Sequence, residues 1–258
     1  MLLTIDVGNT NMVFGMFQEE RLTGSFRLMT DAARTSDEIG LMLCMYLQRF
    51  GLRTEDVEDV IVASVVPQVM HSLSNAISRY LGKTPIVVDD GVDPGLPYGV
   101  SGDERLGADR SVACIAAMEK YGRPLVVLDF GTATTVDAVD REGRYMGGCI
   151  LAGVRIATEA LFRQTAMLPK VELVRPDRVL GYTAVGQIQA GAVEGYIGAV
   201  EHLIGKAKEE LGEPGARVVA TGGLARLIAD GTSLIDVVDS GLVLDGLAII
   251  YRRHKDRR

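Results

Sequence analysis

A short pattern that occurs twice in this sequence limits the folds that the chain can adopt. Each copy begins with an apolar run that ends at an aspartate, continues with a glycine and a small polar residue, and leaves in a second β-forming run. The copies are Ile5 to Asn11 and Asp129 to Thr135. Two β-forming runs joined by so short a glycine-containing segment predict a tight hairpin with a carboxylate near its turn.

The residue types around the predicted turns suit a phosphate and its cation. Glycine lets backbone N–H groups come close to a phosphate, and threonine and asparagine side chains add hydrogen bonds. A carboxylate cannot bind phosphate directly, so we assign Asp6 and Asp129 to a cation or to its water molecules. For either copy alone, an ordinary hairpin with ordinary turn chemistry is the simpler interpretation.

The spacing of the two copies indicates an internal duplication. Asp6 and Asp129 are separated by close to half of the 258 residues, and self-similarity over a fixed spacing is typical of repeated structural units. We therefore predict that each half brings one hairpin to a shared cleft. The sequence has no low-complexity linker, so the duplication alone sets the predicted domains, residues 1–120 and residues 121–258.

Alternating strands and helices are predicted in both halves. Several predicted strands are nearly continuous apolar runs, which indicates sheets covered by helices on both faces. Thr35 and Glu38 have the spacing of a capping box at the start of the first helix. Beyond the hairpins, the expected strands are 21–29, 60–66, 85–88, 145–150 and 218–221, and the expected helices are 36–50, 67–81, 106–121, 154–164, 184–211 and 242–250.

Composition and charge argue against several classes of function. The net charge is −7 and the basic run lies at residues 252–258, whereas a nucleic-acid partner requires a clustered basic surface. Cys44, Cys114 and Cys149 are far apart, so we expect a reducing compartment and no zinc site. The sequence shows no secretion signal and no apolar run of about 18 residues. We therefore expect a soluble cytoplasmic protein with no membrane partner.

The paired hairpins resemble those of the superfamily that contains the acetate and sugar kinases, actin and the heat-shock chaperones. This resemblance implies an α/β fold of two duplicated actin-like (ribonuclease H-like) domains, each a mixed sheet flanked by helices, with an ATP cleft between them. In such a cleft the turn at Thr221 to Gly223 would let the adenosine lie against bare backbone. A plain β-to-α turn is the alternative interpretation of that segment.

Within this superfamily the chain resembles the type III pantothenate kinases over nearly its whole length. Each motif is weak alone, and their joint occurrence in this order is specific. The motifs are Asp6-Val7-Gly8-Asn9-Thr10, Arg34-Thr35-Ser36-Asp37-Glu38, Ser64-Val65-Val66-Pro67, Gly107-Ala108-Asp109-Arg110, Asp129-Phe130-Gly131-Thr132-Ala133-Thr134-Thr135 and Ala220-Thr221-Gly222-Gly223. The resemblance implies ATP-dependent phosphorylation of pantothenate to 4′-phosphopantothenate, the first step of coenzyme A biosynthesis. It also implies a homodimer that uses ATP with Mg²⁺ and a monovalent cation, K⁺ or NH₄⁺.

The resemblance further implies a role for each matching residue. Asp109 corresponds to the general base, Asp129 to a ligand of the monovalent cation, and Asp6 to a ligand of Mg²⁺. Phosphoryl transfer depends mainly on positioning and charge neutralisation, so one carboxylate and its cations suffice. The residues expected to bind ATP are Asp6, Val7, Gly8, Asn9, Thr10, Asn11, Met12, Val13 and Thr132, and those expected to bind pantothenate are Gly107, Ala108, Asp109, Arg110, Thr183 and Ala184.

Several positions on the acceptor side depart from the family pattern. Val100 stands where the family usually has tyrosine, Ala113 where it has asparagine, and Ala184 where it has threonine. Each lost polar contact costs about 1–3 kcal/mol. Two alternatives to a pantothenate kinase therefore stay open: a non-catalytic or regulatory relative, and a kinase of another small hydroxyl compound. Asp109 alone also fits an ordinary acid in the first turn of a helix, but its retention together with Arg110 favours the pantothenate kinase.

Overall fold

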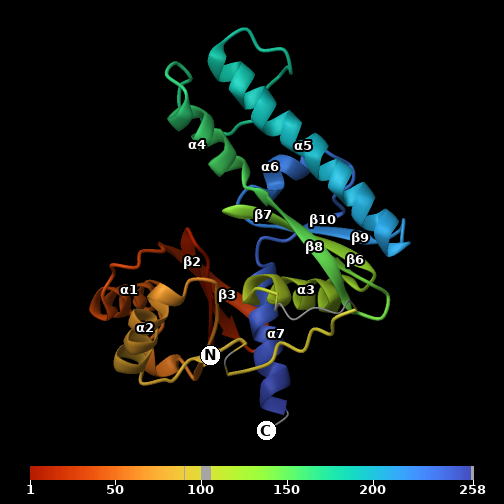
Figure 1. The fold of residues 1–258 in the computed structure, drawn as a ribbon. Helices are drawn as coiled ribbons and strands as arrows, with labels where there is room; N and C mark the ends of the chain where they lie inside the picture. Colours follow the sequence, from red (N-terminus) through yellow and green to blue (C-terminus); the bar gives the residue numbers. More distant parts are fainter. Residues whose placement is uncertain (90, 100–105, 257–258) are drawn as a thin grey trace. The chain divides into compact units, whose positions relative to one another are not determined.

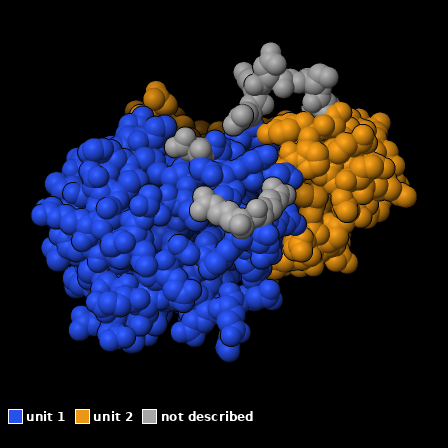
Figure 2. Space-filling view, turned by 90° about the horizontal axis from the view of Figure 1, so that it is seen from below, with its two compact units in different colours: residues 1–95, 104–116, 241–258 blue, residues 96–103, 117–240 orange. Residues whose placement is uncertain are grey.

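The computed structural model describes residues 1–89, 91–99 and 106–256 (Figure 1). The chain divides into two compact units (Figure 2). The first unit comprises residues 1–95, 104–116 and 241–258, and the second comprises residues 96–103 and 117–240. The units are interleaved along the chain, and the domain boundary near residue 120 stays a prediction based on the duplication.

The first unit is built on a mixed β-sheet. Its described strands are β1 (Leu2–Val7), β2 (Asn11–Gln18), β3 (Arg21–Met29), β4 (Asp59–Ser64) and β5 (Ile86–Val87). In space they follow the order β3-β2-β1-β4-β5. The first three strands form an antiparallel meander, and β4 and β5 extend the sheet in parallel from β1. The predicted first hairpin, β1 with β2, is therefore confirmed.

Helices cover both faces of this first sheet. The described ones are α1 (Ser36–Arg49), the 3-10 turn η1 (Thr54–Asp56), α2 (Pro67–Ala76), the π-helical turn η2 (Ile77–Leu81), the first part of α3 (Ala108–Tyr121) and α7 (Leu242–Asp256). Leu43 of α1 and Leu73 of α2 share a buried core with Phe14 of β2. The next residue, Gly15, faces the other side of the sheet, and a Cβ on it would lie 3.0 Å from Leu244 of α7.

The ends of α1 follow from its sequence. Thr35 Oγ1 accepts a hydrogen bond from the backbone N–H of Glu38 (3.3 Å), and Glu38 Oε2 accepts one from the backbone N–H of Thr35 (2.7 Å). This reciprocal pair is the predicted capping box. Gly51 follows the helix with a φ of +75°, a conformation that glycine adopts readily and that commonly ends helices. The predicted start and end of this helix are confirmed.

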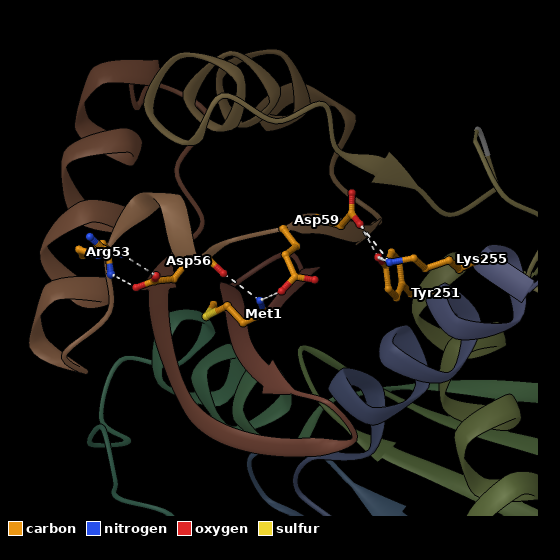
Figure 3. A network of polar contacts seen from close by, with 7 residues as sticks. Met1, Arg53, Asp56, Asp59, Tyr251 and Lys255 are labelled. Carbon is orange, nitrogen blue, oxygen red and sulfur yellow. Dashed lines mark hydrogen bonds and ion pairs between the residues drawn. The ribbon is translucent and has the colours of Figure 1, made fainter.

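The last helix of the chain is tied to the first sheet by polar contacts (Figure 3). Tyr251 of α7 donates its hydroxyl to Asp59 at the start of β4, and Lys255 Nζ donates to the Tyr251 hydroxyl at 3.2 Å. Beside them, the Met1 amino group donates to Glu58 Oε1 at 2.7 Å. These contacts, together with packing of α7 on β1, β2 and β4, explain why residues 241–258 belong to the first unit.

The second unit repeats the sheet topology of the first. Its described strands are β6 (Leu125–Phe130), β7 (Ala133–Val139), β8 (Tyr145–Ala152), β9 (Arg217–Thr221) and β10 (Val237–Val238), in the spatial order β10-β9-β6-β7-β8. β6, β7 and β8 form an antiparallel meander, while β9 is parallel to β6 and β10 to β9. The same arrangement of meander and parallel strands confirms that the sheet is duplicated. β10 was not expected, because two residues carry no periodicity.

Helices α4 (Val154–Gln164), α5 (Ala184–Leu211) and α6 (Ala225–Ala229) complete the second unit (Figure 1). The long helix α5 buries Val193, Ile197 and Val200 against the sheet, a spacing that keeps these side chains on one helix face. The predicted span 184–211 is confirmed. Across the part of the chain that the structure describes, no helix combines the length and the apolar character needed to cross a membrane.

The turn between β7 and β8 is held by a charged pair, which gives a stability prediction. Arg144 donates its backbone N–H to Asp140 Oδ1 (2.8 Å) and its Nε–H to Oδ2 (2.7 Å). Burial alone would raise the pKa of Asp140, but these hydrogen bonds outweigh burial and lower the pKa below the ordinary 3.8. Asp140→Asn should therefore lower the free energy of unfolding by about 1–3 kcal/mol at neutral pH.

The pH dependence of that effect follows from the direction of the shift. A lowered pKa in the folded state stabilises the protein above the unfolded-state pKa, and this stabilisation is lost as pH falls through the folded-state pKa. Urea unfolding of both proteins, repeated from neutral pH to below pH 3.8, should show the difference shrinking in acid. A difference that does not change with pH would mean that the charge of Asp140 contributes nothing.

Candidate functional site

The turn of the first hairpin is closed by its own backbone. Gly8 donates its N–H to the carbonyl oxygen of Asn11 at 3.0 Å. Asn9 and Thr10 at the tip are exposed, whereas Asp6 is half-buried near the end of β1, between β2 and β4. The first hairpin therefore presents polar residues at its tip and a carboxylate at its base, as the sequence predicts.

The residues predicted to contact ATP differ in how exposed their side chains are. The side chains of Val7 and Met12 are fully buried in the core beneath α1 and α2. Only the backbone groups of these two residues can therefore contact a ligand. Asn11 is exposed and Val13 is half-buried, so their side chains remain accessible in this unit.

The second hairpin has the same plan with a shorter turn. Gly131 donates its N–H to Ala133 O at 3.1 Å. Asp129 pairs in the sheet with Thr135 of β7 and with Thr221 of β9. Asp129 and Thr132 are both half-buried. The duplicated carboxylate thus stands two residues before the turn glycine in both sheets.

Glycine backbone packs directly against the second hairpin. Gly222, which follows β9, has a φ of +93°, and a Cβ there would lie 2.5 Å from Asp129 Oδ1 and 2.6 Å from the backbone N of Phe130. A Cβ on Gly153 would lie 2.8 Å from Gly131 O. Gly222 stands in a sequence motif, whereas Gly153 carries no local signal beyond being a glycine between a strand and a helix.

The packing around Gly222 predicts a large and local cost of substitution. Gly222→Ala should lower the free energy of unfolding by about 2–4 kcal/mol, because the new methyl group meets Asp129 and Phe130 and the positive φ disfavours alanine. Gly223→Ala is the matched control, since a Cβ there has no atom within 4 Å in the described structure; its change should stay within about 0.5 kcal/mol. Thermal unfolding of both variants measures the contrast, and equal losses would refute it.

Asp109 lies near the carboxyl ends of β1 and β4 in the first sheet. It stands in the first turn of α3 and is half-buried, and its Oδ1 accepts the backbone N–H of Arg110 at 2.8 Å. A Cβ on Gly107 would lie 2.8 Å from that same oxygen and 3.7 Å from Val65. Val65 in turn donates its N–H to Val7 O at 3.1 Å. Gly107 therefore lies near both the carboxylate of Asp109 and Val65, the residue that bonds to the end of β1.

The other predicted pantothenate-binding residues fall in both units, each at the start of a helix. Gly107 and Arg110 are half-buried and Ala108 is buried at the start of α3. Thr183 and Ala184 are exposed at the start of α5. Thr183 Oγ1 accepts a backbone N–H from the first turn of α5, so this hydroxyl serves as the N-cap of the helix.

The positions that depart from the family pattern have different surroundings. Val100 lies outside the described residues. Ala113 is buried within α3, where a polar side chain would need a hydrogen-bond partner. Tyr98, two positions before Val100, is 44% exposed, and its ring meets that of Tyr145 edge-on at 5.7 Å between centroids. The aromatic ring nearest in sequence to Val100 is thus packed against β8.

The residues at these turns fit a nucleotide and its magnesium ion. Mg²⁺ is usually bound through one or two carboxylates together with water and substrate phosphates, and Asp6 supplies that ligand type beside the glycine-containing turn. Gly223, in the same turn as Gly222, offers backbone with open space beside it, since a Cβ there would meet no atom within 4 Å in the described structure. Within residues 1–89, 91–99 and 106–256, no three or more His, Cys, Asp or Glu side chains gather as a metal-binding group.

Comparison with known proteins decides the family. The model of the family described as type III pantothenate kinase matches residues 2–206. A type III pantothenate kinase of Agathobacter rectalis is 45% identical over 253 residues, covering 98% of this chain and 97% of that protein. The chain belongs to the type III pantothenate kinase family. Both hairpins, Asp109 and the start of α5 lie inside the range that the family model matches.

Solved structures agree on the fold of this type III pantothenate kinase family member. A Baf-family protein of Campylobacter jejuni matches with a TM-score of 0.61 at 19% identity, covering 98% of this chain and 99% of the other. The activator of the 2-hydroxyisocaproyl-CoA dehydratase from Clostridium difficile, with bound ADPNP, matches with a TM-score of 0.52 at 13% identity, covering 99% and 96%. Identities this low show the fold alone. The predicted α/β class, with two duplicated actin-like domains that each contain a mixed sheet flanked by helices, is confirmed.

Proposed function

We propose that this protein phosphorylates pantothenate with ATP in the cytoplasm, giving 4′-phosphopantothenate and ADP in the first step of coenzyme A biosynthesis. The observation that carries this proposal is 45% identity to a type III pantothenate kinase over 98% of the chain. The reaction requires a phosphate-binding backbone, a base and charge neutralisation. The chain contains a candidate residue for each requirement.

Asp109 acts as the general base in this proposal. Its carboxylate accepts the proton of the primary hydroxyl of pantothenate while the hydroxyl oxygen bonds to the γ-phosphorus. The bond between that phosphorus and the oxygen that leaves with ADP breaks in the same step. The hydrogen bond from Arg110 N (2.8 Å) orients the carboxylate, which is the positioning that general-base catalysis needs. The Arg110 side chain supplies a cationic donor on the substrate side.

The two hairpins bind the nucleotide in this proposal. ATP with Mg²⁺ supplies the phosphoryl group and neutralises part of its charge. The backbone and polar side chains of Gly8, Asn9 and Thr10 contact the phosphates, Thr132 adds a hydroxyl, and Asp6 binds the magnesium ion directly or through water.

Asp129 holds a monovalent cation, K⁺ or NH₄⁺, in this proposal. Support comes from its position at the end of β6, where it is half-buried and its Oδ1 packs on the backbone of Gly222. A half-buried carboxylate is stabilised by a cation.

Exposed apolar side chains of the second unit support the proposed homodimer, since burying such side chains commonly drives association between protein chains. The exposed apolar residues lie on α4, on the segment that follows it and at the start of α5, and include Ile156, Leu161, Phe162, Met167, Leu180, Tyr182 and Val185. A second copy of this chain is the proposed partner, and sedimentation equilibrium of the purified protein measures the assembly.

The test of the proposed function is ADP release by the purified protein with ATP, Mg²⁺ and K⁺. Pantothenate is compared with a panel of other small hydroxyl compounds, such as glycerol and hexoses. We expect ADP release that depends on pantothenate. Release with another compound of the panel would indicate a different acceptor. Release with none of them, in a protein that still binds ATP, would indicate a non-catalytic relative.

A further inference from the structure

A threonine outside every sequence motif holds the turn of the first hairpin. Thr30 follows β3 and is half-buried. Its Oγ1 donates to the carbonyl oxygen of Gly8 at 2.7 Å, and its backbone N–H donates to the carbonyl oxygen of Thr10 at 2.9 Å. A single residue just beyond β3 therefore donates hydrogen bonds to the carbonyl oxygens on both sides of Asn9.

The sheet register explains why this residue reaches the turn. Asn11 of β2 pairs with Met29 of β3, so Thr30 is the first residue beyond the paired strands, next to Thr10. Its backbone N–H extends the ladder by one step, to Thr10, and its hydroxyl reaches Gly8, two residues further along the turn. The turn is thus fixed from the β3 side as well as by its own Gly8 to Asn11 hydrogen bond.

The two carbonyl oxygens matter because of the chemistry of a phosphate. A phosphate offers only hydrogen-bond acceptors and negative charge, so a nearby carbonyl oxygen repels it, whereas N–H and O–H groups attract it. A turn that binds phosphate must therefore keep its carbonyl oxygens directed elsewhere. Thr30 does this for Gly8 and Thr10, and a turn held in its bound conformation loses less conformational entropy when the ligand arrives.

We propose that Thr30 is a positioning residue for the nucleotide: its hydroxyl, bound to Gly8 O, keeps the first turn in the conformation that accepts the ATP phosphates. This inference rests on the proposed function, because it takes the first hairpin as part of the ATP site. Thr30 acts through the turn and contacts no reacting atom. Its loss should therefore act mainly on nucleotide affinity.

The test compares three substitutions on β3 and just after it. Thr30→Val removes the hydroxyl at nearly constant shape and keeps the backbone N–H, while Thr30→Ser retains the hydroxyl. Thr23→Val is the matched control: Thr23 Oγ1 donates to Met16 O at 3.0 Å, which is the same type of bond from β3 to β2, away from the turn. Binding of a non-hydrolysable ATP analogue by calorimetry and steady-state kinetics are measured for each variant.

We expect Thr30→Val to raise the Kd of the analogue and the KM for ATP about tenfold, which corresponds to about 1.4 kcal/mol, with little change in the KM for pantothenate. Thr30→Ser should stay within about twofold of the parent protein, since serine retains the hydroxyl that donates to Gly8 O. Thr23→Val should lower the melting temperature as Thr30→Val does and leave nucleotide affinity unchanged.

Two results would overturn the inference: parental nucleotide affinity in Thr30→Val, or an equal loss of affinity in Thr23→Val. The outcome is separable from that of the proposed function. A parent protein that binds the analogue but makes no 4′-phosphopantothenate would refute the pantothenate kinase. Weakened binding in Thr30→Val, rescued by serine, would still support the role of Thr30.

Discussion

Replacing Asp109 by asparagine should lower the turnover of pantothenate by about 10²–10⁴-fold, the usual contribution of a general base. The melting temperature and ATP affinity should stay close to those of the parent protein. Asparagine is isosteric, and its Oδ1 can still accept the backbone N–H of Arg110, which Asp109 Oδ1 accepts at 2.8 Å. The substitution therefore removes the basicity of the side chain and keeps its packing against Gly107. Steady-state kinetics, calorimetry with an ATP analogue and thermal unfolding are the three measurements.

Asp37 provides the control for this experiment. It is also an acid in the first turn of a helix, α1, and accepts hydrogen bonds from Arg79 Nη1 and the Tyr80 hydroxyl at 2.8 Å each. Asp37→Asn should cost some stability and leave turnover near the parental value. Turnover near the parental value in both Asp37→Asn and Asp109→Asn would identify Asp109 as an ordinary helix acid.

Turnover should also depend on a monovalent cation held by Asp129. In a buffer with sodium as its monovalent cation we expect little activity, and K⁺ or NH₄⁺ should restore it. Asp129→Ala should abolish this dependence and lower turnover by about 10²-fold, because the site loses a positive charge that stabilises developing negative charge. The measurement is the initial rate as a function of K⁺, NH₄⁺ and Na⁺ concentration at constant ionic strength.

Asp137 of β7 offers the matched control for Asp129. It is a buried carboxylate of the same sheet that accepts the Tyr145 hydroxyl at 3.0 Å. Asp137→Asn should lower stability but preserve the response to K⁺. Full activity of the parent protein in sodium, or a normal potassium response in Asp129→Ala, would contradict the proposed cation site.

The elements that the sequence predicts well are those determined by neighbouring residues. The two hairpins follow from an aspartate, a glycine and flanking β-forming runs. The capping box of Thr35 and Glu38 is complete within four positions, and the apolar period of α5 is visible along one segment. Because these signals are local, no knowledge of distant contacts is needed. The likeness of the two sheets could also be predicted, since the duplication repeats the local pattern.

The features that the sequence does not predict depend on distant residues. The packing of α7 on the first sheet joins residues that are far apart in the sequence, such as Tyr251 and Asp59. The role of Thr30 depends on the register of Met29 against Asn11, a pairing that cannot be read from either segment alone. The helix predicted over 67–81 is α-helical to Ala76 and then π-helical, a change that apolar periodicity is too coarse to detect.

Pantothenate phosphorylation is tested by quantifying ADP and 4′-phosphopantothenate in one reaction of the purified protein with ATP, Mg²⁺, K⁺ and pantothenate. Mass spectrometry identifies the phosphorylated product, and its amount is compared with the ADP formed. We expect the two products in equal amounts in the parent protein, and both to fall together in Asp109→Asn. ADP formation without 4′-phosphopantothenate, or neither product in a protein that binds ATP, would contradict the assignment as a pantothenate kinase.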